Sequence, residues 1–150
     1  MRLYAESSAV LAWLLGEVDG EEIRRQLAAA EEIFTSVLTL VEIDRVLIRA
    51  QVVEGLREGD VVDRRRALAR ASGHWHLLQL HEEILGRARR PFPGEPIRTL
   101  DALHLASALT ARAALPELAV LSLDSSIRRT STELGFEVFP SGGASAQPFA

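Results

Sequence analysis

The sequence predicts a single α/β domain with three layers, in which helices cover both faces of a central, mostly parallel sheet of about five strands. Short apolar runs alternate with segments of helical pattern along the chain, and such alternation is typical of βαβ units. The length of 150 residues suits one domain with one sizeable core. A composition of 47% hydrophobic and 25% charged residues is that of a globular chain.

The short apolar runs are the expected strands, and the segments between them are the expected helices. The strands are 3–5, 33–36, 75–80, 119–123 and 137–139. The helices are 8–15, 20–30, 37–51, 59–71, 81–89, 99–113 and 125–134. At least one helix separates each strand from the next, and parallel neighbours need such crossover connections.

Residues at the ends of these segments support the boundaries. Ser7 or Ser8 can accept from the free N–H groups of the first helix, and Thr99 can do so for the helix that follows it, so these are the expected N-caps. The stretch "RRPFPGEPIRT" predicts an exposed loop. The stretch "SGGASAQPFA", residues 141–150, is small and polar, so we expect a flexible tail after a domain of residues 1–140.

Composition and charge exclude several classes of protein. The chain has no cysteine, which excludes a disulfide framework and a thiolate metal site. No apolar run approaches the roughly 20 residues of a membrane span and no signal-peptide pattern begins the chain, so we expect a cytoplasmic protein without a membrane partner. All 17 basic residues are arginines, but the formal charge of -4 disfavours simple electrostatic binding of nucleic acid.

Four acidic residues lie where an α/β sheet places its functional sites. Glu6 follows the first expected strand and Asp124 follows the fourth, and sites in open α/β sheets form outside the carboxyl ends of the strands. Asp101 lies in the first turn of its helix, where the helix dipole also favours an acid. Glu42 lies farther along the helix that follows the second strand. We expect the four side chains to converge at one edge of the sheet.

Converging carboxylates need a cation. They repel one another unless cations fill the space between them. Oxygen ligands suit Mg²⁺ or Mn²⁺, whereas zinc prefers more nitrogen or sulfur. Metal ions held in this way activate water and stabilise the leaving oxygen during phosphodiester hydrolysis. The four acids therefore predict a magnesium- or manganese-dependent site for phosphodiester chemistry.

Four stretches together resemble the motif regions of the PIN domain, and most closely those of the VapC-type toxins of bacterial toxin–antitoxin pairs. These stretches are "LYAESSAVLAWLL", "TSVLTLVEIDRVLIRA", "TLDALHLASAL" and "VLSLDSSIRRTSTELGFEV". The resemblance implies a PIN-like fold and a metal-dependent endoribonuclease that cleaves structured RNA such as tRNA or rRNA. It also implies a small VapB-type antitoxin that occupies the active-site groove, and a homodimer.

The resemblance also assigns roles to single residues. Glu42, Asp101 and Asp124 match the second, third and fourth acids of the family, which implies catalytic and metal-binding roles. Ser8 matches a small hydroxyl residue that holds a carboxylate or a metal-bound water. Glu6 matches the first acid, where the family usually has aspartate. Its extra methylene leaves three outcomes open: an active site of altered geometry, a weakened site, or a silent domain that still binds its partner.

Arginines are the expected contacts for RNA, because guanidinium groups pair with phosphates or stack on unpaired bases. Arg45 and Arg49 lie on the Glu42 side of their helix, although Arg45 can instead pair with Glu42 or Asp44. The other candidates come from the proline-rich loop and its flanks: Arg89, Arg90 and Arg98.

Two alternative interpretations remain. A PIN-like module without catalytic activity would bind RNA or an antitoxin, and metal occupancy at Glu6 and Asp101 would separate it from the nuclease. An unrelated phosphohydrolase would use Asp124 as a covalent nucleophile, but it would need an aspartate where this chain has Ser126. His104 follows Asp101 by one turn, and a helix histidine with apolar neighbours is more often a packing residue than a ligand or base.

Overall fold

The computed structural model describes residues 1–142, and its helices and strands follow the expected order. The strands are β1 (Arg2–Ala5), β2 (Glu32–Ser36), β3 (His76–Leu78), β4 (Ala119–Leu121) and β5 (Val138–Phe139). The helices are α1 (Ser7–Leu15), α2 (Gly20–Ala29), α3 (Val37–Glu54), α4 (Glu58–Ser72), α5 (Glu82–Ala88), α6 (Thr99–Ala114) and α7 (Ser125–Glu133). Most of the expected tail, residues 143–150, lies outside the described residues.

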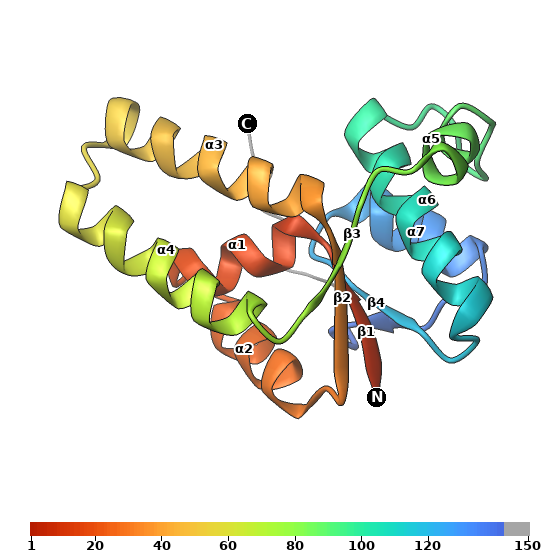
Figure 1. The fold of residues 1–150 in the computed structure, drawn as a ribbon, viewed down its shortest axis with the longest axis horizontal. Coiled ribbons are helices and arrows are strands. Elements are labelled where there is room, and N and C mark those ends of the chain that lie inside the picture. The colour runs from red at the N-terminus through yellow and green to blue at the C-terminus, as the bar shows by residue number, and fades with distance from the viewer. Residues whose placement is uncertain (143–150) are drawn as a thin grey trace.

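The five strands form one parallel sheet in the order β3-β2-β1-β4-β5. In the central strand, Leu3 lies opposite Ile33 of β2 on one side and Ala119 of β4 on the other. Helices α1 to α4 cover one face of the sheet, and α5, α6 and α7 cover the other (Figure 1). The three-layer α/β fold is therefore confirmed, and all the strands end at the same edge.

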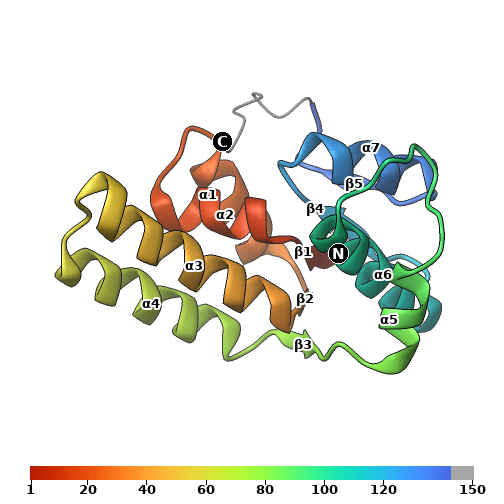
Figure 2. The same cartoon turned by 90° about the horizontal axis from the view of Figure 1, so that it is seen from above.

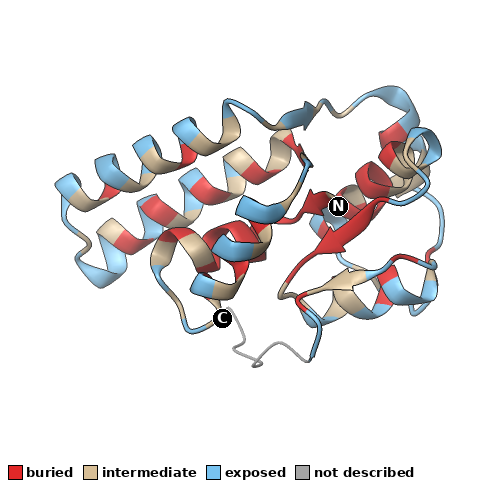
Figure 3. Ribbon diagram, turned by 90° about the horizontal axis from the view of Figure 1, so that it is seen from below, coloured by how far each residue is buried: buried red, intermediate tan, exposed pale blue. Residues whose placement is uncertain are grey.

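The core is divided between the two faces of the sheet because side chains alternate along each strand. In β1, Leu3 and Ala5 belong to the cluster that packs against α1 to α4, while Tyr4 belongs to the cluster on the side of α6. Figure 3 shows the central strands as buried and the outer faces of the helices as exposed. Tyr4 thus faces α6 and is fully buried.

Helices α3 and α4 run side by side as a long helical hairpin (Figure 2). α3 ends at Gly55, whose φ of 70° is the left-handed conformation that glycine adopts easily. Glu42 lies near the start of α3, which is the end that adjoins the sheet. None of the described helices, α3 included, is long and apolar enough to cross a membrane.

Two of the expected N-caps are wrong. The cap of α1 is Glu6 rather than Ser7 or Ser8, because the backbone of Glu6 is extended and its side chain accepts from the backbone N–H of Ser8. The cap of α6 is Arg98, whose side chain makes no capping bond, and Thr99 is already helical. The first correction makes the Glu6 carboxylate part of the start of a helix.

Candidate functional site

The carboxyl ends of β1 and β4 bring Glu6 and Ser122 together at the centre of the sheet. Ala5 and Leu121 are paired across the two strands. The backbone N–H of Glu6 donates to the carbonyl of Leu121 at 3.0 Å, so the residues that follow each strand are neighbours. Asp124 comes two residues after Ser122 and begins α7. The expected edge of the sheet therefore carries both acids.

Glu6 is 3% exposed, and its carboxylate accepts four hydrogen bonds. Oε1 accepts from the Ser7 hydroxyl at 2.6 Å and from the Ser8 backbone N–H at 3.1 Å. Oε2 accepts from the Ser122 hydroxyl at 2.7 Å and from the Ser8 hydroxyl. Because a carboxylate offers about four acceptor positions, the protein's own donors fill those of Glu6.

Ser8 links α1 to the loop that follows β4. Its hydroxyl donates to Glu6, and its oxygen accepts from the backbone N–H groups of Leu123 at 2.9 Å and Asp124 at 3.1 Å. The hydroxyl of Ser122 also accepts from the backbone N–H of Asp124 at 3.1 Å. Two serines thus fix the backbone from which the Asp124 side chain projects.

Arg98 lies between two of the expected metal ligands. Its Nε is 3.2 Å from Oδ2 of Asp101, and its Nη2 is 3.6 Å from Oδ2 of Asp124. The other oxygen of Asp124 caps α7 by accepting from the backbone N–H of Ile127 at 2.9 Å. The side chain of Arg98 is 77% exposed and that of Asp101 is 9% exposed. Two carboxylates therefore share one cation that reaches them from the surface.

The pKa of Asp101 is raised, and the causes show what surrounds it. Burial has the largest effect, the charge of Asp124 adds to it, Arg98 opposes it, and Glu6 raises the pKa further. In return, Asp101 raises the pKa of Arg98, with smaller contributions from Asp124 and Glu42. The four acids therefore act on one region, which has the excess negative charge that a cation relieves.

Glu42 reaches this region from α3 and is paired with a histidine of α6. Its Oε1 lies 2.5 Å from Nε2 of His104, and Nδ1 of His104 lies 2.8 Å from the hydroxyl oxygen of Tyr4. Burial lowers the pKa of His104, but the hydrogen bond to Glu42 and the charges of Glu6, Glu42 and Asp101 outweigh it, so the pKa is raised. The histidine expected as a packing residue is thus a buried partner of a candidate ligand.

The acids suit a magnesium or manganese ion chemically, but the full convergence expected of them is not observed. Within residues 1–142, no three acidic or histidine side chains are placed to hold one ion. The side chain of Glu6 caps α1, and that of Glu42 contacts His104. Asp101 and Asp124 nevertheless face a common cation, the guanidinium of Arg98. Mg²⁺ is commonly held by one or two carboxylates and several waters, and the chemistry of this pair fits such an ion.

The other expected RNA-binding arginines lie on the surface. Arg45 and Arg49 are exposed on α3, and Arg89 and Arg90 are exposed after α5. The expected alternative partners of Arg45 are both paired elsewhere, since Glu42 contacts His104 and the Asp44 carboxylate lies 2.9 Å from Arg65. Arg98 is the candidate that reaches the acids directly.

Sequence reasoning did not assign Ser7, Ser122 or Tyr4 to the site, and it considered Ser7 only as a helix cap. Both serines donate to Glu6, and Tyr4 contacts His104. Their signals in the sequence are weak. Ser122 precedes Asp124 by two residues, and Tyr4 alternates with the apolar side chains of β1 that face the other layer.

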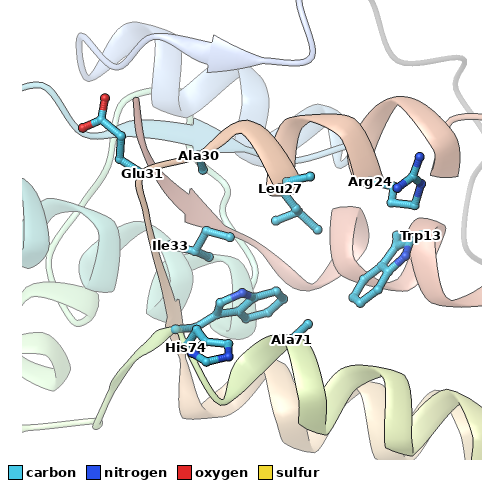
Figure 4. Close-up of a pocket in the computed structure, with 10 residues that line it drawn as sticks. Trp13, Arg24, Leu27, Ala30, Glu31, Ile33, Ala71 and His74 are labelled. Atoms are coloured by element: carbon cyan, nitrogen blue, oxygen red, sulfur yellow. The ribbon is translucent and has the colours of Figure 1, made fainter.

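A separate cavity of about 340 Å³ lies between α1, α2 and the end of α4 (Figure 4). Its lining is mostly apolar and includes two tryptophan rings. The lining residues are Trp13, Arg24, Leu27, Ala28, Ala30, Glu31, Ile33, Ala71, His74 and Trp75. The expected site residues are not among them, so the cavity is distinct from the acidic site.

The fold and the acids define a class of protein: a three-layer α/β domain with an acidic site at the carboxyl edge of a parallel sheet, where two carboxylates contact one arginine. A sequence model of the PIN domain matches residues 3–133. The chain therefore belongs to the PIN domain family.

Curated relatives of the chain are VapC proteins of Mycobacterium tuberculosis. The chain is 33% identical to Ribonuclease VapC46 over 106 residues, which cover 71% of this chain and 73% of that protein. It is 30% identical to Ribonuclease VapC35 over 144 residues, which cover 95% of this chain and 98% of that protein. A solved toxin–antitoxin complex from Klebsiella pneumoniae is similar in fold, with a TM-score of 0.63 at 15% identity over 95% of this chain and 99% of that one. Within the family, the chain is thus of the VapC type.

Proposed function

We propose that the protein is an endoribonuclease that hydrolyses phosphodiester bonds of RNA and requires Mg²⁺ or Mn²⁺. The observation that carries this proposal is the contact of both Asp101 and Asp124 with Arg98, because it marks a position where two carboxylates stabilise positive charge. The names of the curated relatives support ribonuclease activity. The oxygen-rich ligand set favours magnesium or manganese over zinc.

Asp101 and Asp124 would hold the ion, and Glu42 would complete the set directly or through a bound water. The bound ion lowers the pKa of a water molecule and stabilises charge on the phosphate. Glu6 adds negative charge from inside the protein, where its serine donors keep it. Arg98 contacts both carboxylates, so an ion held by them would replace its guanidinium there, and the guanidinium would then be free to pair with a substrate phosphate.

The proposed substrate is a structured RNA such as tRNA or rRNA. Loops of such RNAs present unpaired bases that can stack on guanidinium groups, while their phosphates accept bidentate hydrogen bonds. Exposed arginines on α3 and after α5 are the candidates to supply these groups: Arg45, Arg49, Arg89 and Arg90.

The proposed regulator is a VapB-type antitoxin that occupies the active-site groove. The support is the likeness of the fold to a chain solved in a toxin–antitoxin complex. The homodimer implied by the family resemblance stays a prediction, which sedimentation of the purified chain tests.

The experiment is cleavage of a pool of total tRNA and rRNA by folded, antitoxin-free protein in Mn²⁺, in Mg²⁺ and in EDTA. We expect discrete fragments with 5′-phosphate ends in metal and intact RNA in EDTA. Asp101→Asn and Asp124→Asn should each lower the rate by at least about 100-fold, because loss of an outer-shell partner alone costs about 10- to 100-fold. Asp44→Asn is the matched control, since this carboxylate pairs with Arg65 on the surface.

The outcomes separate the alternatives. Intact RNA in every metal condition would contradict the nuclease and favour a module that binds RNA or an antitoxin. Cleavage of RNA by a Glu6→Asp variant but not by the wild type would show that glutamate at this position abolishes activity. Fragments that persist in EDTA would contradict the metal requirement.

A further inference from the structure

We propose that His104, supported by Tyr4, is a positioning residue that fixes the carboxylate of Glu42 at the acid-bearing edge of the sheet. The inference rests on the proposed function, because Glu42 is one of the acids assigned there. The contact connects the two helical layers, since α3 and α6 lie on opposite sides of the sheet (Figure 1). Glu42 and His104 are 62 residues apart in the chain.

The hydrogen-bond roles at His104 follow from its partners. A carboxylate only accepts, so Nε2 of His104 carries a hydrogen and donates it to Glu42. In the neutral ring, Nδ1 accepts from the hydroxyl of Tyr4, and in the charged ring it donates to the same oxygen. Both ring nitrogens are occupied in either state. His104 therefore has no lone pair left for a metal ion and no free nitrogen for a substrate proton.

Burial makes this arrangement rigid. His104 and Tyr4 are each 1% exposed, whereas the side chain of Glu42 is 23% exposed. Glu42 is thus the member of the trio that reaches solvent. A glutamate on a helix surface loses considerable rotamer entropy when it is fixed, and Arg45 lies three residues farther along α3, at a spacing that permits an ion pair. The hydrogen bond to His104 holds Glu42 away from that alternative.

The pair adjoins the region that Asp101 and Arg98 occupy. The charge of Glu42 acts on Arg98, and the charges of Glu6 and Asp101 act on His104. A residue that orients a ligating side chain acts through that side chain, and loss of such a partner costs about 10- to 100-fold in metal affinity or activity. His104 has the burial, the donor and the location for this role.

Mn²⁺ affinity of the full chain, measured by calorimetry without RNA, tests the role. We expect His104→Leu and Glu42→Gln each to weaken binding by about 10- to 100-fold. The double variant should be no weaker than the more severe single variant, because His104 acts only through Glu42. His104→Gln, whose amide can donate to Glu42, should restore most of the affinity, and it replaces His104→Leu if that variant fails to fold. His81→Gln, at an exposed histidine, should bind like the wild type.

A second readout needs no metal. The Nε2–H proton of His104 should give a slowly exchanging, downfield NMR signal that Glu42→Gln shifts or removes. Absence of that signal from the folded wild type, or additive losses of Mn²⁺ affinity in the double variant, would overturn the proposal. A wild type that shows the signal but binds no Mn²⁺ would instead overturn the proposed metal requirement and leave the pair intact.

Discussion

The hydroxyl of Ser122 donates to Oε2 of Glu6 at 2.7 Å, across 116 residues of sequence. This bond joins the loop after β4 to the N-cap of α1, at the ends of two neighbouring strands. Glu6 is therefore a structural link of the site as well as a source of negative charge. Its contacts differ from those of Asp101 and Asp124, which face Arg98.

Glu6→Gln should lower the free energy of unfolding by about 1–3 kcal/mol, because the amide nitrogen cannot accept from the buried donors that the carboxylate satisfies. Urea unfolding measures this loss. The Mn²⁺ affinity of the same variant should fall less than that of Asp101→Asn. Glu54→Gln, at an exposed position near the end of α3, is the control for both measurements. A stable Glu6→Gln protein with the larger loss of Mn²⁺ affinity would make Glu6 a direct ligand.

Arg98→Ala should strengthen Mn²⁺ binding several-fold, because it removes the cation that competes for Asp101 and Asp124. It should also weaken RNA binding and reduce the slope of log affinity against log salt by about one, if the guanidinium contacts one phosphate. Calorimetry and salt-dependent RNA binding measure the two effects. Arg66→Ala is the control, since Arg66 is exposed and 4.0 Å from Asp63. Weaker Mn²⁺ binding in Arg98→Ala would contradict the idea that Arg98 and the ion compete for the two carboxylates.

Tyr4 should stay protonated in the folded protein at pH values where an ordinary tyrosine ionises. Burial, and then the charge of Glu6, raises its pKa well above 10.0. The unfolded chain therefore releases the phenol proton at a lower pH, so this contribution to stability is complete below about pH 10 and is lost as the pH rises further.

The chain contains one tyrosine and no lysine or cysteine, so tyrosinate absorbance reports on Tyr4 alone. We expect that absorbance to appear together with unfolding, as followed by circular dichroism. In Tyr4→Phe, stability should depend less on pH above about 10. Tyrosinate that forms near pH 10 in a protein with native circular dichroism would contradict this prediction.

Gly20→Ala and Gly59→Ala should change stability in opposite directions. A Cβ at Gly20 would lie 2.5 Å from the carbonyl oxygen of Ala12, where α2 packs against α1, so overpacking should cost about 1–3 kcal/mol. A Cβ at Gly59, inside α4, meets nothing within 4 Å, and alanine there should add up to about 1 kcal/mol of helix stability. Urea unfolding measures the free energy of unfolding of the two variants. If both substitutions change it equally, the backbone at Ala12 must shift to make room for the new methyl group.

The sequence by itself determined the order and type of the elements, because apolar periodicity and turn residues are local signals. It also placed Glu6 and Asp124 at one edge of the sheet, since parallel strands all end on the same side. Segment ends were less accurate. The helix expected over 37–51 continues to Glu54, because the chain first turns into the left-handed region at Gly55.

Only the tertiary structure decided which groups the acids contact. The positions of Glu42 and His104 in the sequence do not indicate that their side chains, which come from helices in opposite layers, contact each other at 2.5 Å. The carboxylate of Glu6 accepts from Ser7 and Ser8, which follow it in the sequence, and from Ser122, which only the pairing of β1 with β4 brings to it. The physical reason is that sequence pattern fixes the face on which a side chain lies, whereas a hydrogen bond depends on separations of about 3 Å that the packing of the layers sets.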